Sequence, residues 1–415
     1  MKSFISSCFL FLLLSYHLTA QPGWTIYNST NSPLPENSVR CIAIDHNGVK
    51  WVGTDYGLAS FDDVTWNVFQ TFNSGIPDNS IRSLAVDQQN NLWIGTFSGG
   101  LAKYDGAVFT VYNIFNSDLP DDFVRCLAVD TLNKLWVGTI GGLAYFDEIT
   151  WEIYNNSNSI LGSNNIGSLF VDNTDNSVSI GTINGGLTIK EDTTWTLYSL
   201  GNSNLPDNTI LGLDKDSSGV LWMATPAAGL SAHIGGFSFL TLNTVSSTIA
   251  SNSLTGISIA PDESIWASCN DSGIIKRSGN SFYNYNTVNS PLPDDFVHTV
   301  FTDSAGIIWI GTLQGGLIRF DESLYLGLEN EDKKESLQLY PVPANEWITI
   351  NTTSDKMFDI YIYDISGQVI YTENFISNKS SVLINTSHFA SGVYSARVVL
   401  KSGYRMDKKF VVLHP

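Results

Sequence analysis

The sequence predicts an all-β protein, a seven-bladed β-propeller followed by a small C-terminal β-sandwich of the immunoglobulin-like type. Three observations predict this fold. A tryptophan recurs with a period of about 43 residues, short β-branched and aromatic runs alternate with Asp, Asn and Gly turns, and the composition changes after residue 336. A period of this length is typical of propeller blades that each contain four strands.

Length and composition set the first limits on function. The chain has 415 residues, of which 43% are apolar and 12% aromatic, so it is long enough for two domains with hydrophobic cores. Its formal charge of -19 repels nucleic acid and anionic lipid. We therefore expect no nucleic-acid partner.

The N-terminus predicts a secretory signal peptide over residues 1–20. Lys2 supplies the charged start, an apolar run follows, and Ala20 closes a small-residue cleavage site. The mature chain is expected to begin at Gln21. No later stretch reaches about 18 apolar residues, so no transmembrane segment is predicted.

Seven repeats follow, and each is expected to form one blade. The second copy shows four strand-like runs, IRSLAVD, NLWIGT, GLAKYD and FTVYN, separated by turns. We expect the repeated tryptophan to wedge between neighbouring sheets, and the Gly-Gly turn (Gly99 and Gly100, for example) to supply positive φ. The repeated position holds Trp51, Trp93, Trp136, Ser179, Trp222, Trp266 and Trp309.

The two ends of the repeat array predict how the ring closes. Residues 24–28 match the fourth run of a unit, yet they precede the first complete unit, whereas the last unit (residues 297–321) lacks its fourth run. The N-terminal strand is therefore expected to complete the last blade, which leaves no exposed edge. The propeller domain is predicted over residues 21–325.

Three cysteines lie beyond the predicted signal. Cys41 and Cys126 occupy the same slot in repeats separated by one whole unit. Sheets stacked about 10 Å apart would hold these two cysteines beyond disulfide distance. We interpret both, and Cys269, as small core residues.

The repeat resembles the two-component regulator propeller repeat of bacterial sensor ectodomains. The motif is clearest as DSAGIIWIGTLQGGL at residues 303–317, and the resemblance covers residues 24 to 323. The fourth to sixth copies depart from it at Ser179, at Pro226 to Leu230 and at Trp266 to Gly273. Those sensors continue into a membrane helix and a kinase that this chain lacks, so the resemblance implies a recognition scaffold.

A charged linker is predicted over residues 326–336, before a second domain over residues 337–415. Its alternating runs predict a small antiparallel sandwich. YPVPAN at residues 340–345, DISGQ at 364–368, SGVY at 391–394 and DKKFVV at 407–412 resemble the C-terminal sorting domain of type IX secretion in Bacteroidetes. Val342 departs from the usual Asn of that family.

This second resemblance implies a route and a partner. The type IX secretion machinery would recognise the C-terminal domain after export through the inner membrane to the periplasm. The domain would then be removed, with a cut near Glu329 to Ser336, where the charged linker is open to a protease. The propeller would reach the outer-membrane cell surface or be secreted.

One position interrupts the apolar pattern of the first strand, eleven residues before the tryptophan. Arg40, Arg82 and Arg125 hold it in copies one to three and His298 in copy seven, whereas the remaining copies carry Gly167, Leu211 and Thr255. Copies seven, one, two and three are neighbours in a closed ring. If the first strand is innermost, these four side chains form a cationic arc at one rim of the channel, suited to the carboxylate or sulfate groups of an acidic glycan.

Local ion pairing is the alternative for the same arc. An acid precedes each cation by four residues, at Glu36, Asp78, Asp121 and Asp294. Asp207 keeps the acid in a copy where position 211 is Leu, which favours a role for the acid in the turn. Both interpretations remain open from the sequence.

Catalytic and metal-binding patterns are sparse. Asp214 to Gly219 resembles the start of a calcium loop but lacks its later glutamate, and no nucleotide, zinc or serine-hydrolase motif occurs. We therefore predict no catalytic residue, no metal and no cofactor. The predicted function is a secreted or surface module that binds a glycan or protein ligand without turnover. The alternative is a propeller-type polysaccharide lyase, with His298 beside Arg40 or Arg82 at the channel mouth.

Overall fold

The computed structural model describes residues 23–324, 337–352, 357–365, 368–400 and 405–414. The chain divides into two compact units between residues 326 and 327. The predicted signal peptide (1–20) and linker (326–336) lie outside the described residues, as does the expected cleavage segment. Apart from one short 3-10 helix, η1 (Glu322–Leu324), the regular elements within the described residues are β-strands.

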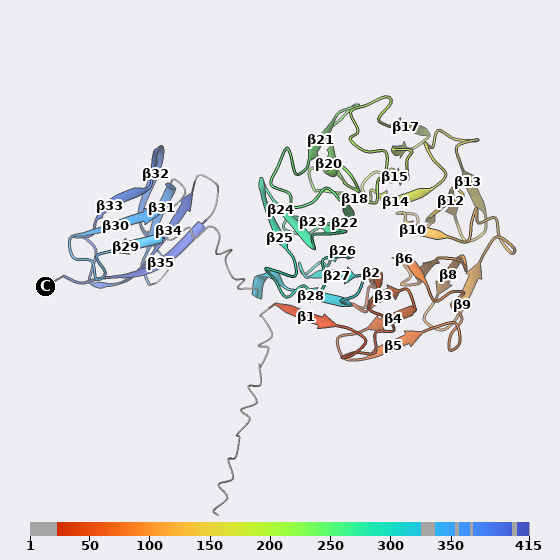
Figure 1. Ribbon diagram of the computed structural model, residues 1–415, viewed down its shortest axis with the longest axis horizontal. Helices are drawn as coiled ribbons and strands as arrows, with labels where there is room; N and C mark the ends of the chain where they lie inside the picture. The colour runs from red at the N-terminus through yellow and green to blue at the C-terminus, as the bar shows by residue number, and fades with distance from the viewer. Residues whose placement is uncertain (1–22, 325–336, 353–356, 366–367, 401–404, 415) are drawn as a thin grey trace, which may run out of the picture. The chain divides into compact units, whose positions relative to one another are not determined.

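The first unit is a propeller of seven four-stranded antiparallel sheets, which confirms the predicted fold (Figure 1). The innermost strands are β2 (Val39–Ile44), β6 (Ile81–Val86), β10 (Val124–Val129), β14 (Ile166–Val171), β18 (Gly212–Lys215), β22 (Leu254–Ile259) and β26 (Val297–Thr302). Each contacts the innermost strand of the next sheet, and β26 contacts β2. The sheets therefore form a closed ring.

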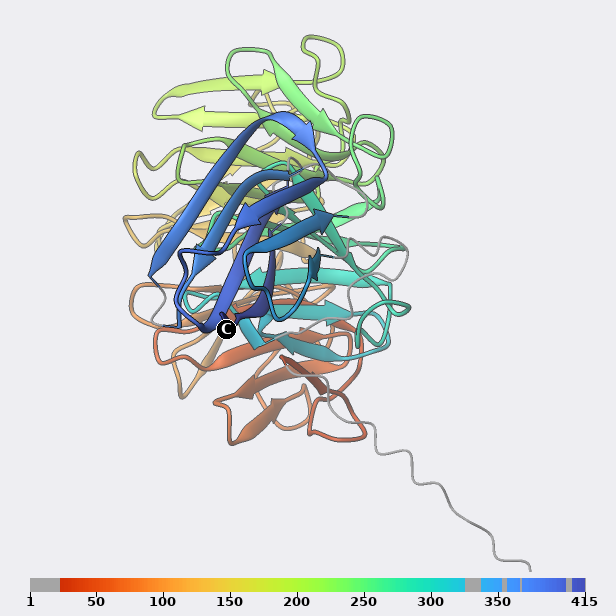
Figure 2. The ribbon, with the colours of Figure 1, turned by 90° about the vertical axis from the view of Figure 1, so that its left-hand side faces the viewer.

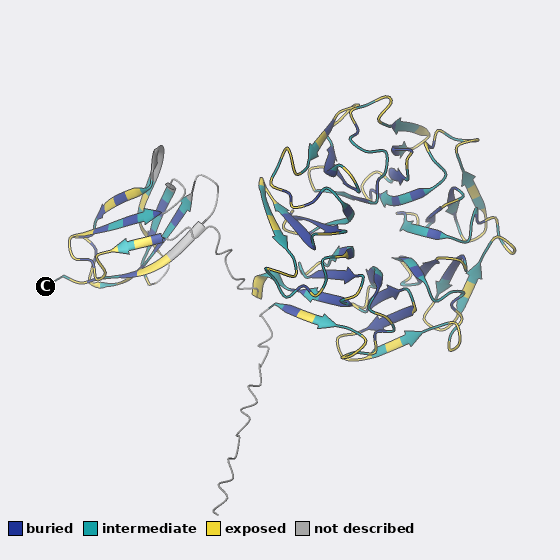
Figure 3. Ribbon diagram, viewed as in Figure 1, coloured by how far each residue is buried: buried dark blue, intermediate teal, exposed yellow. Residues whose placement is uncertain are grey.

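The second strands are the most buried elements of the ring. They are β3 (Lys50–Thr54), β7 (Leu92–Thr96), β11 (Leu135–Thr139), β15 (Val178–Thr182), β19 (Leu221–Thr225), β23 (Ile265–Cys269) and β27 (Ile308–Thr312). All five residues of each are buried (Figure 3). Neighbouring sheets cover both faces of these strands, which explains their unbroken apolar sequence.

The third and fourth strands complete the blades toward the outside. The third strands are β4 (Gly57–Phe61), β8 (Leu101–Tyr104), β12 (Leu143–Phe146), β16 (Leu187–Glu191), β20 (Gly229–His233), β24 (Ile274–Ser278) and β28 (Leu317–Phe320). The outermost strands are β1 (Trp24–Tyr27), β5 (Trp66–Phe69), β9 (Phe109–Tyr112), β13 (Trp151–Tyr154), β17 (Thr194–Tyr198), β21 (Phe239–Leu242) and β25 (Ser281–Tyr285). In the perpendicular view, the propeller strands run along the axis of the ring (Figure 2).

The N-terminal strand closes the ring as predicted. β1 is the outermost strand of the sheet β1-β28-β27-β26, and Trp24 pairs with Phe320 while Tyr27 pairs with Leu317. The last blade therefore combines strands from both ends of the repeat array, and this pairing holds the ring shut.

The repeated tryptophans pack between blades, as predicted. Trp51 of the first blade lies in one core cluster with Ile81, Leu92 and Ile94 of the second blade. Its indole N–H also donates to the Asp45 carboxylate at 3.1 Å. The same Asp–Trp bond recurs for Asp87 and Trp93, Asp216 and Trp222, and Asp303 and Trp309. The aspartate of the repeat therefore satisfies a buried indole as well as its own turn.

The Gly-Gly turn needs each glycine for a different reason. Gly100 adopts a φ of 83°, as expected, but Gly99 does not have positive φ. A Cβ on Gly99 would lie 2.8 Å from the carbonyl carbon of Pro77 in the preceding loop. The expectation of positive φ is therefore correct only for the second glycine, whereas the first allows a close backbone approach.

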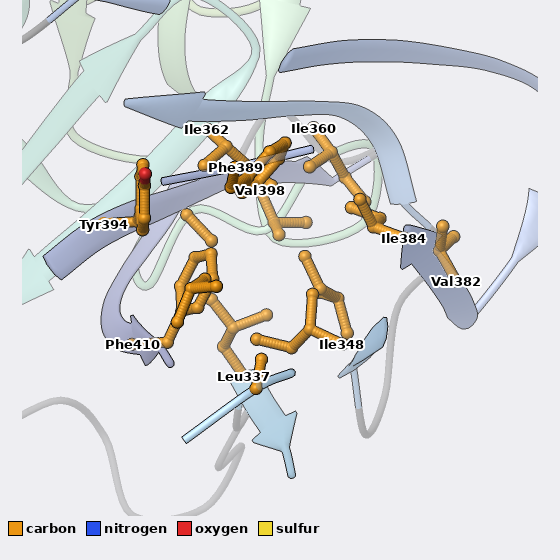
Figure 4. Packing of buried hydrophobic residues seen from close by; sticks show 14 residues of the cluster. Leu337, Ile348, Ile360, Ile362, Val382, Ile384, Phe389, Tyr394, Val398 and Phe410 are labelled. Carbon is orange, nitrogen blue, oxygen red and sulfur yellow. The ribbon is translucent and has the colours of Figure 1, made fainter. Parts of the chain in front are cut away.

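The C-terminal unit is a two-sheet sandwich. One sheet has the order β29-β30-β33 and the other β32-β31-β34-β35. Ile348 and Ile384 of the first sheet pack against Ile360, Val398 and Phe410 of the second, and all are buried (Figure 4). The strands are β29 (Leu337–Tyr340), β30 (Trp347–Thr352), β31 (Met357–Tyr363), β32 (Val369–Lys379), β33 (Ser381–Asn385), β34 (Gly392–Leu400) and β35 (Arg405–Val412).

Candidate ligand-binding site at the channel rim

Each predicted site residue occupies a β-bulge in an innermost strand. In the first blade Val39 pairs with Thr54 and Cys41 with Gly53, so Arg40 has no partner across the ladder. The same register shift leaves out Arg82, Arg125 and His298. A bulge removes its extra residue from the regular alternation of the sheet and re-aims the side chain. The backbone therefore sets the four side chains apart from the apolar residues around them.

Asp55 holds Arg40 in place. The Arg40 Nη2 lies 2.6 Å from the Asp55 Oδ2, and Nε donates to both carboxylate oxygens at 3.0 Å. The Ser38 hydroxyl donates to the same carboxylate at 2.7 Å. Burial raises the pKa of Asp55, but the hydrogen bonds from Arg40 and Ser38 outweigh it, and the net pKa lies below the usual value. Arg40 is therefore engaged by an internal anion.

Arg82 has a weaker ion pair than Arg40, and Arg125 has none among the described residues. Arg82 Nη1 lies 3.3 Å from the Asp55 Oδ1, and the buried Nε of Arg82 has no hydrogen-bond partner among the described residues. Arg125 has no ion pair within the described residues, and its buried Nε also lacks a partner there. Burial lowers the pKa of both guanidiniums, but arginine stays protonated at neutral pH.

Two phenylalanines lie between these arginines. Arg82 stands over the Phe97 ring at 4.9 Å, and Arg125 over the Phe123 ring at 4.8 Å. The two ring centroids are 4.7 Å apart. Phe97 follows the second strand of one blade and Phe123 precedes the first strand of the next. The contact therefore joins the two arginines across a blade boundary.

His298 is the fourth member of the arc. Burial, together with the nearby Arg40 charge, lowers its pKa to about 4, so the imidazole is neutral at pH 7. Its buried Nε2 has no hydrogen-bond partner among the described residues. The arc therefore carries three cations and one neutral ring at physiological pH.

The acids that precede the arc do not pair with it. Asp78 accepts from the backbone N–H of Ser80 at 3.0 Å and from the N–H and hydroxyl of Ser98 at 2.8 Å. Asp207 makes the equivalent bonds to the backbone N–H groups of Thr209 and Ala227. The pairing alternative is therefore wrong about its partners, because these acids hold the turns and Asp55 is the carboxylate that reaches the arc.

Sequence reasoning missed three residues of this site, Asp55, Phe97 and Phe123. Asp55 follows the Gly-Thr of the second strand, and aligning that slot across the repeats would have shown it as the single acid there. The slot holds Asp55, Phe97, Ile140, Ile183, Pro226, Asn270 and Leu313.

The loop that resembled a calcium site is occupied by protein donors. The Asp216 carboxylate accepts from the Ser218 hydroxyl, from the Val220 N–H and from the Trp222 indole. Asp214 accepts from the Ile259 N–H of the next blade at 2.7 Å, and its burial raises the pKa to about 6. In the part of the chain that the structure describes, no group of three or more His, Cys, Asp or Glu side chains is placed to hold a metal ion.

Family comparisons decide the relationship of both units. Residues 75–98, 118–141 and 291–314 match the two component regulator propeller model, and residues 338–413 match the secretion system C-terminal sorting domain. The chain combines regulator-type propeller repeats with a C-terminal sorting domain. No curated protein matches it in sequence. Among the described residues, no helix has the length and apolar character needed to cross a membrane.

Several solved structures share the fold of this chain. The extracellular domain of the putative hybrid two component system BT3049 from B. thetaiotaomicron is 20% identical, with a TM-score of 0.63 over 95% of this chain and 58% of that chain. PorZ, a surface component of the type-IX secretion system of Porphyromonas gingivalis, is 16% identical, with a TM-score of 0.59 over 91% and 60%. The chain thus spans about three fifths of either protein.

A shorter neighbour is an enzyme. Virginiamycin B lyase from Staphylococcus aureus is 12% identical, with a TM-score of 0.58 over 72% of this chain and 99% of the lyase chain. At this identity the likeness shows the fold alone, because one fold serves many unrelated functions.

Proposed function

We propose that this protein binds an anionic ligand at the rim of the propeller channel and does not turn it over. The observation that carries the proposal is Arg125, a partly buried guanidinium without an ion pair among the described residues, in a chain with a formal charge of -19. A desolvated cation without a counter-ion costs free energy that a bound anion offsets.

The chemistry of the arc supports binding over catalysis. A lyase needs a base and an acid in reach of the same substrate carbon and leaving group. Asp55 is fully engaged by Arg40 and Ser38, and the remaining ionised members of the arc are arginines, which do not exchange protons at neutral pH. His298, as a neutral imidazole, is the one candidate base for the alternative, a propeller-type polysaccharide lyase.

The sorting domain supports the place of action. A secretion system C-terminal sorting domain indicates a secreted or cell-surface protein. We propose that the type IX machinery handles residues 337–415 after passage through the periplasm, and that the propeller then meets its ligand outside the outer membrane. The candidate ligands at that location are acidic glycans and proteins.

Incubation of the purified chain with a panel of acidic glycans tests the proposal. We expect one or more glycans to be retained with unchanged length. New unsaturated chain ends would assign the lyase activity instead, and the absence of both retention and product would leave the propeller as a structural surface protein. Arg125→Gln should lose this retention. Arg319→Gln is its matched control, because Arg319 pairs with Asp321 and lies on β28, two strands outside the β26 strand that carries His298.

A further inference from the structure

The four side chains Arg82, Phe97, Phe123 and Arg125 form one continuous row across the second and third blades. Each guanidinium lies over a ring, at 4.9 and 4.8 Å, and the two rings are 4.7 Å apart and tilted by 56°. Cation–π contact holds each guanidinium over the face of its ring. The row therefore presents apolar ring surface flanked by forked hydrogen-bond donors.

The row is open to a ligand. Phe97 is 48% exposed, so part of its ring is accessible to a ligand. Phe123 is half-buried, and its N–H donates to Asp121 at 2.8 Å, which fixes the loop that carries it. Both phenylalanines thus lie in loops directly adjoining the strands β7 and β10, and the Phe97 ring still faces solvent.

The positive charge of the arc is distributed unevenly, because Asp55 neutralises part of it. An anion is therefore expected to bind where Asp55 does not reach. Asp55 makes three hydrogen bonds with Arg40, one contact with Arg82 and none with Arg125 within the described residues. Arg40 is already neutralised, whereas the excess positive charge lies at Arg82 and Arg125, the same two residues that flank the rings. The anion site therefore coincides with the aromatic surface.

We infer that this row is a subsite for ring-borne carboxylates, and that the ligand class is an acidic oligosaccharide that contains uronic acid residues. The inference rests on the proposed binding function and adds the ligand class and the residues. Each carboxylate of the oligosaccharide accepts from the N–H groups of one guanidinium, that of Arg82 or that of Arg125, and the C–H face of a sugar ring packs on Phe97 and Phe123 between them.

Chemistry favours a uronate over other anions. A uronic acid carries its carboxylate directly on a rigid ring, so one residue presents the anion and the apolar face in a fixed relation. Acidic peptide side chains carry the carboxylate on a flexible stem and would leave the phenyl rings uncovered. A neutral sugar would leave both guanidiniums without a counter-ion, which costs free energy in a partly buried site.

Calorimetric titration of the full chain tests the inference with four probes: trigalacturonate, neutral galactotriose, poly-L-glutamate and sodium sulfate. We expect trigalacturonate to bind more tightly than each of the others. Arg125→Gln is expected to weaken trigalacturonate about tenfold, and Phe97→Ala about three- to tenfold. Arg319→Gln and Phe72→Ala are matched controls that leave its affinity unchanged, since Phe72 is an exposed ring (79%) in a different loop. Circular dichroism of every variant confirms folding.

The contrary outcomes separate this inference from the proposed function. If poly-L-glutamate or sulfate binds as tightly as trigalacturonate, with loss in Arg125→Gln and no effect of Phe97→Ala, the uronate subsite is wrong and the anion-binding function stands. If galactotriose binds equally well, the charge role is wrong. If the binding of none of the probes, and of no other acidic glycan, is weakened in Arg125→Gln, both the subsite and the proposed function are wrong.

Discussion

Trp24 stacks on Phe320 with ring centroids 4.0 Å apart, and this contact joins the first strand of the propeller to the last repeat. The equivalent contact inside the first blade is Trp66 on Phe61, at 4.4 Å. Both pairs are stacked, with interplanar angles of 19° and 15°, but Trp24 is 6% exposed and lies at the closure of the propeller.

Removing the Trp24 side chain should weaken the pairing of β1 with β28 in the last blade. Trp24→Ala is expected to lower the unfolding free energy by about 3–5 kcal/mol, because it removes a buried stacked ring. Hydrogen exchange should rise in Leu317–Phe320, the partner strand. Trp151→Ala is the matched control, because Trp151 stacks on Phe146 with ring centroids 4.0 Å apart in the third blade, which two other blades separate from the last. Equal protection of Leu317–Phe320 in both variants would contradict a closing role for Trp24.

Asn90 links two neighbouring blades. It adopts a φ of 66°, and its side-chain oxygen accepts from the His46 N–H of the preceding blade at 2.7 Å. Asn133 makes the same bond to Gln88. Gly48, Gly219 and Gly306 hold this position in other blades and have no side chain to do so.

Asn90→Gly keeps the backbone conformation and removes only the link between the blades. We expect a loss of about 0.5–1.5 kcal/mol in stability and faster exchange of the His46 amide. Exchange of the Gln88 amide, held by Asn133, should stay unchanged and serves as the internal control. Unaltered exchange at His46 would show that the bond contributes nothing in solution.

Asp214 should make stability depend on pH. Burial raises its pKa to about 6, from an ordinary value of 3.8. A raised folded-state pKa favours the folded state most below the unfolded pKa, and that contribution is lost as pH rises through about 6. Asp214→Asn lacks this loss, so its stability relative to the parent should increase by about 2.4 kcal/mol between pH 4 and pH 7.

Urea midpoints of parent and Asp214→Asn at several pH values measure this difference. An Asn side chain accepts a weaker hydrogen bond from the Ile259 N–H, which lowers the stability of the variant by the same amount at every pH. The change of the stability difference with pH therefore reports the ionisation of Asp214. Asp303→Asn in the last blade is a control, because Asp303 is bonded to its own turn and to Trp309. A difference that stays flat across this range would rule out a neutral Asp214 in the folded state.

Deletion of residues 337–415 should block surface delivery. The family match places the sorting signal within this unit, so the truncated chain is expected to accumulate in the periplasm. Cell fractionation measures the distribution. As the converse control, residues 337–415 fused to an unrelated exported protein should carry it to the surface or the medium. Undiminished surface display of the truncated propeller would refute a sorting role.

Much of the fold follows from local sequence. The period, the Asp–Trp repeat and the Gly-Gly turns define four strands per blade because each signal reports a local requirement: a buried indole needs a partner, and a tight hairpin needs Gly100. The split last blade was predictable for the same reason, since Trp24 to Tyr27 carries the pattern of an outermost strand.

The candidate site was only partly predictable. The bulge positions of Arg40, Arg82 and Arg125 appear in sequence as breaks in an apolar run. Their partners lie across the ladder or on the next blade, so acids close in sequence such as Asp78 were misleading. Asp78 sits near Arg82 along the chain, but its carboxylate is turned into the loop by Ser80 and Ser98.

The sequence by itself determined the repeat, the number of blades, the closure and the sorting domain, because these depend on periodic patterning and on motifs within short segments. Only the tertiary structure decided which cations are free. Asp55 engages Arg40 and leaves Arg125 unpaired, and Phe97 meets Phe123 across two blades, through side-chain distances that no spacing along the chain encodes. The physical reason is that ion pairing and ring contact depend on separations of a few ångström in space, which the closed ring alone fixes.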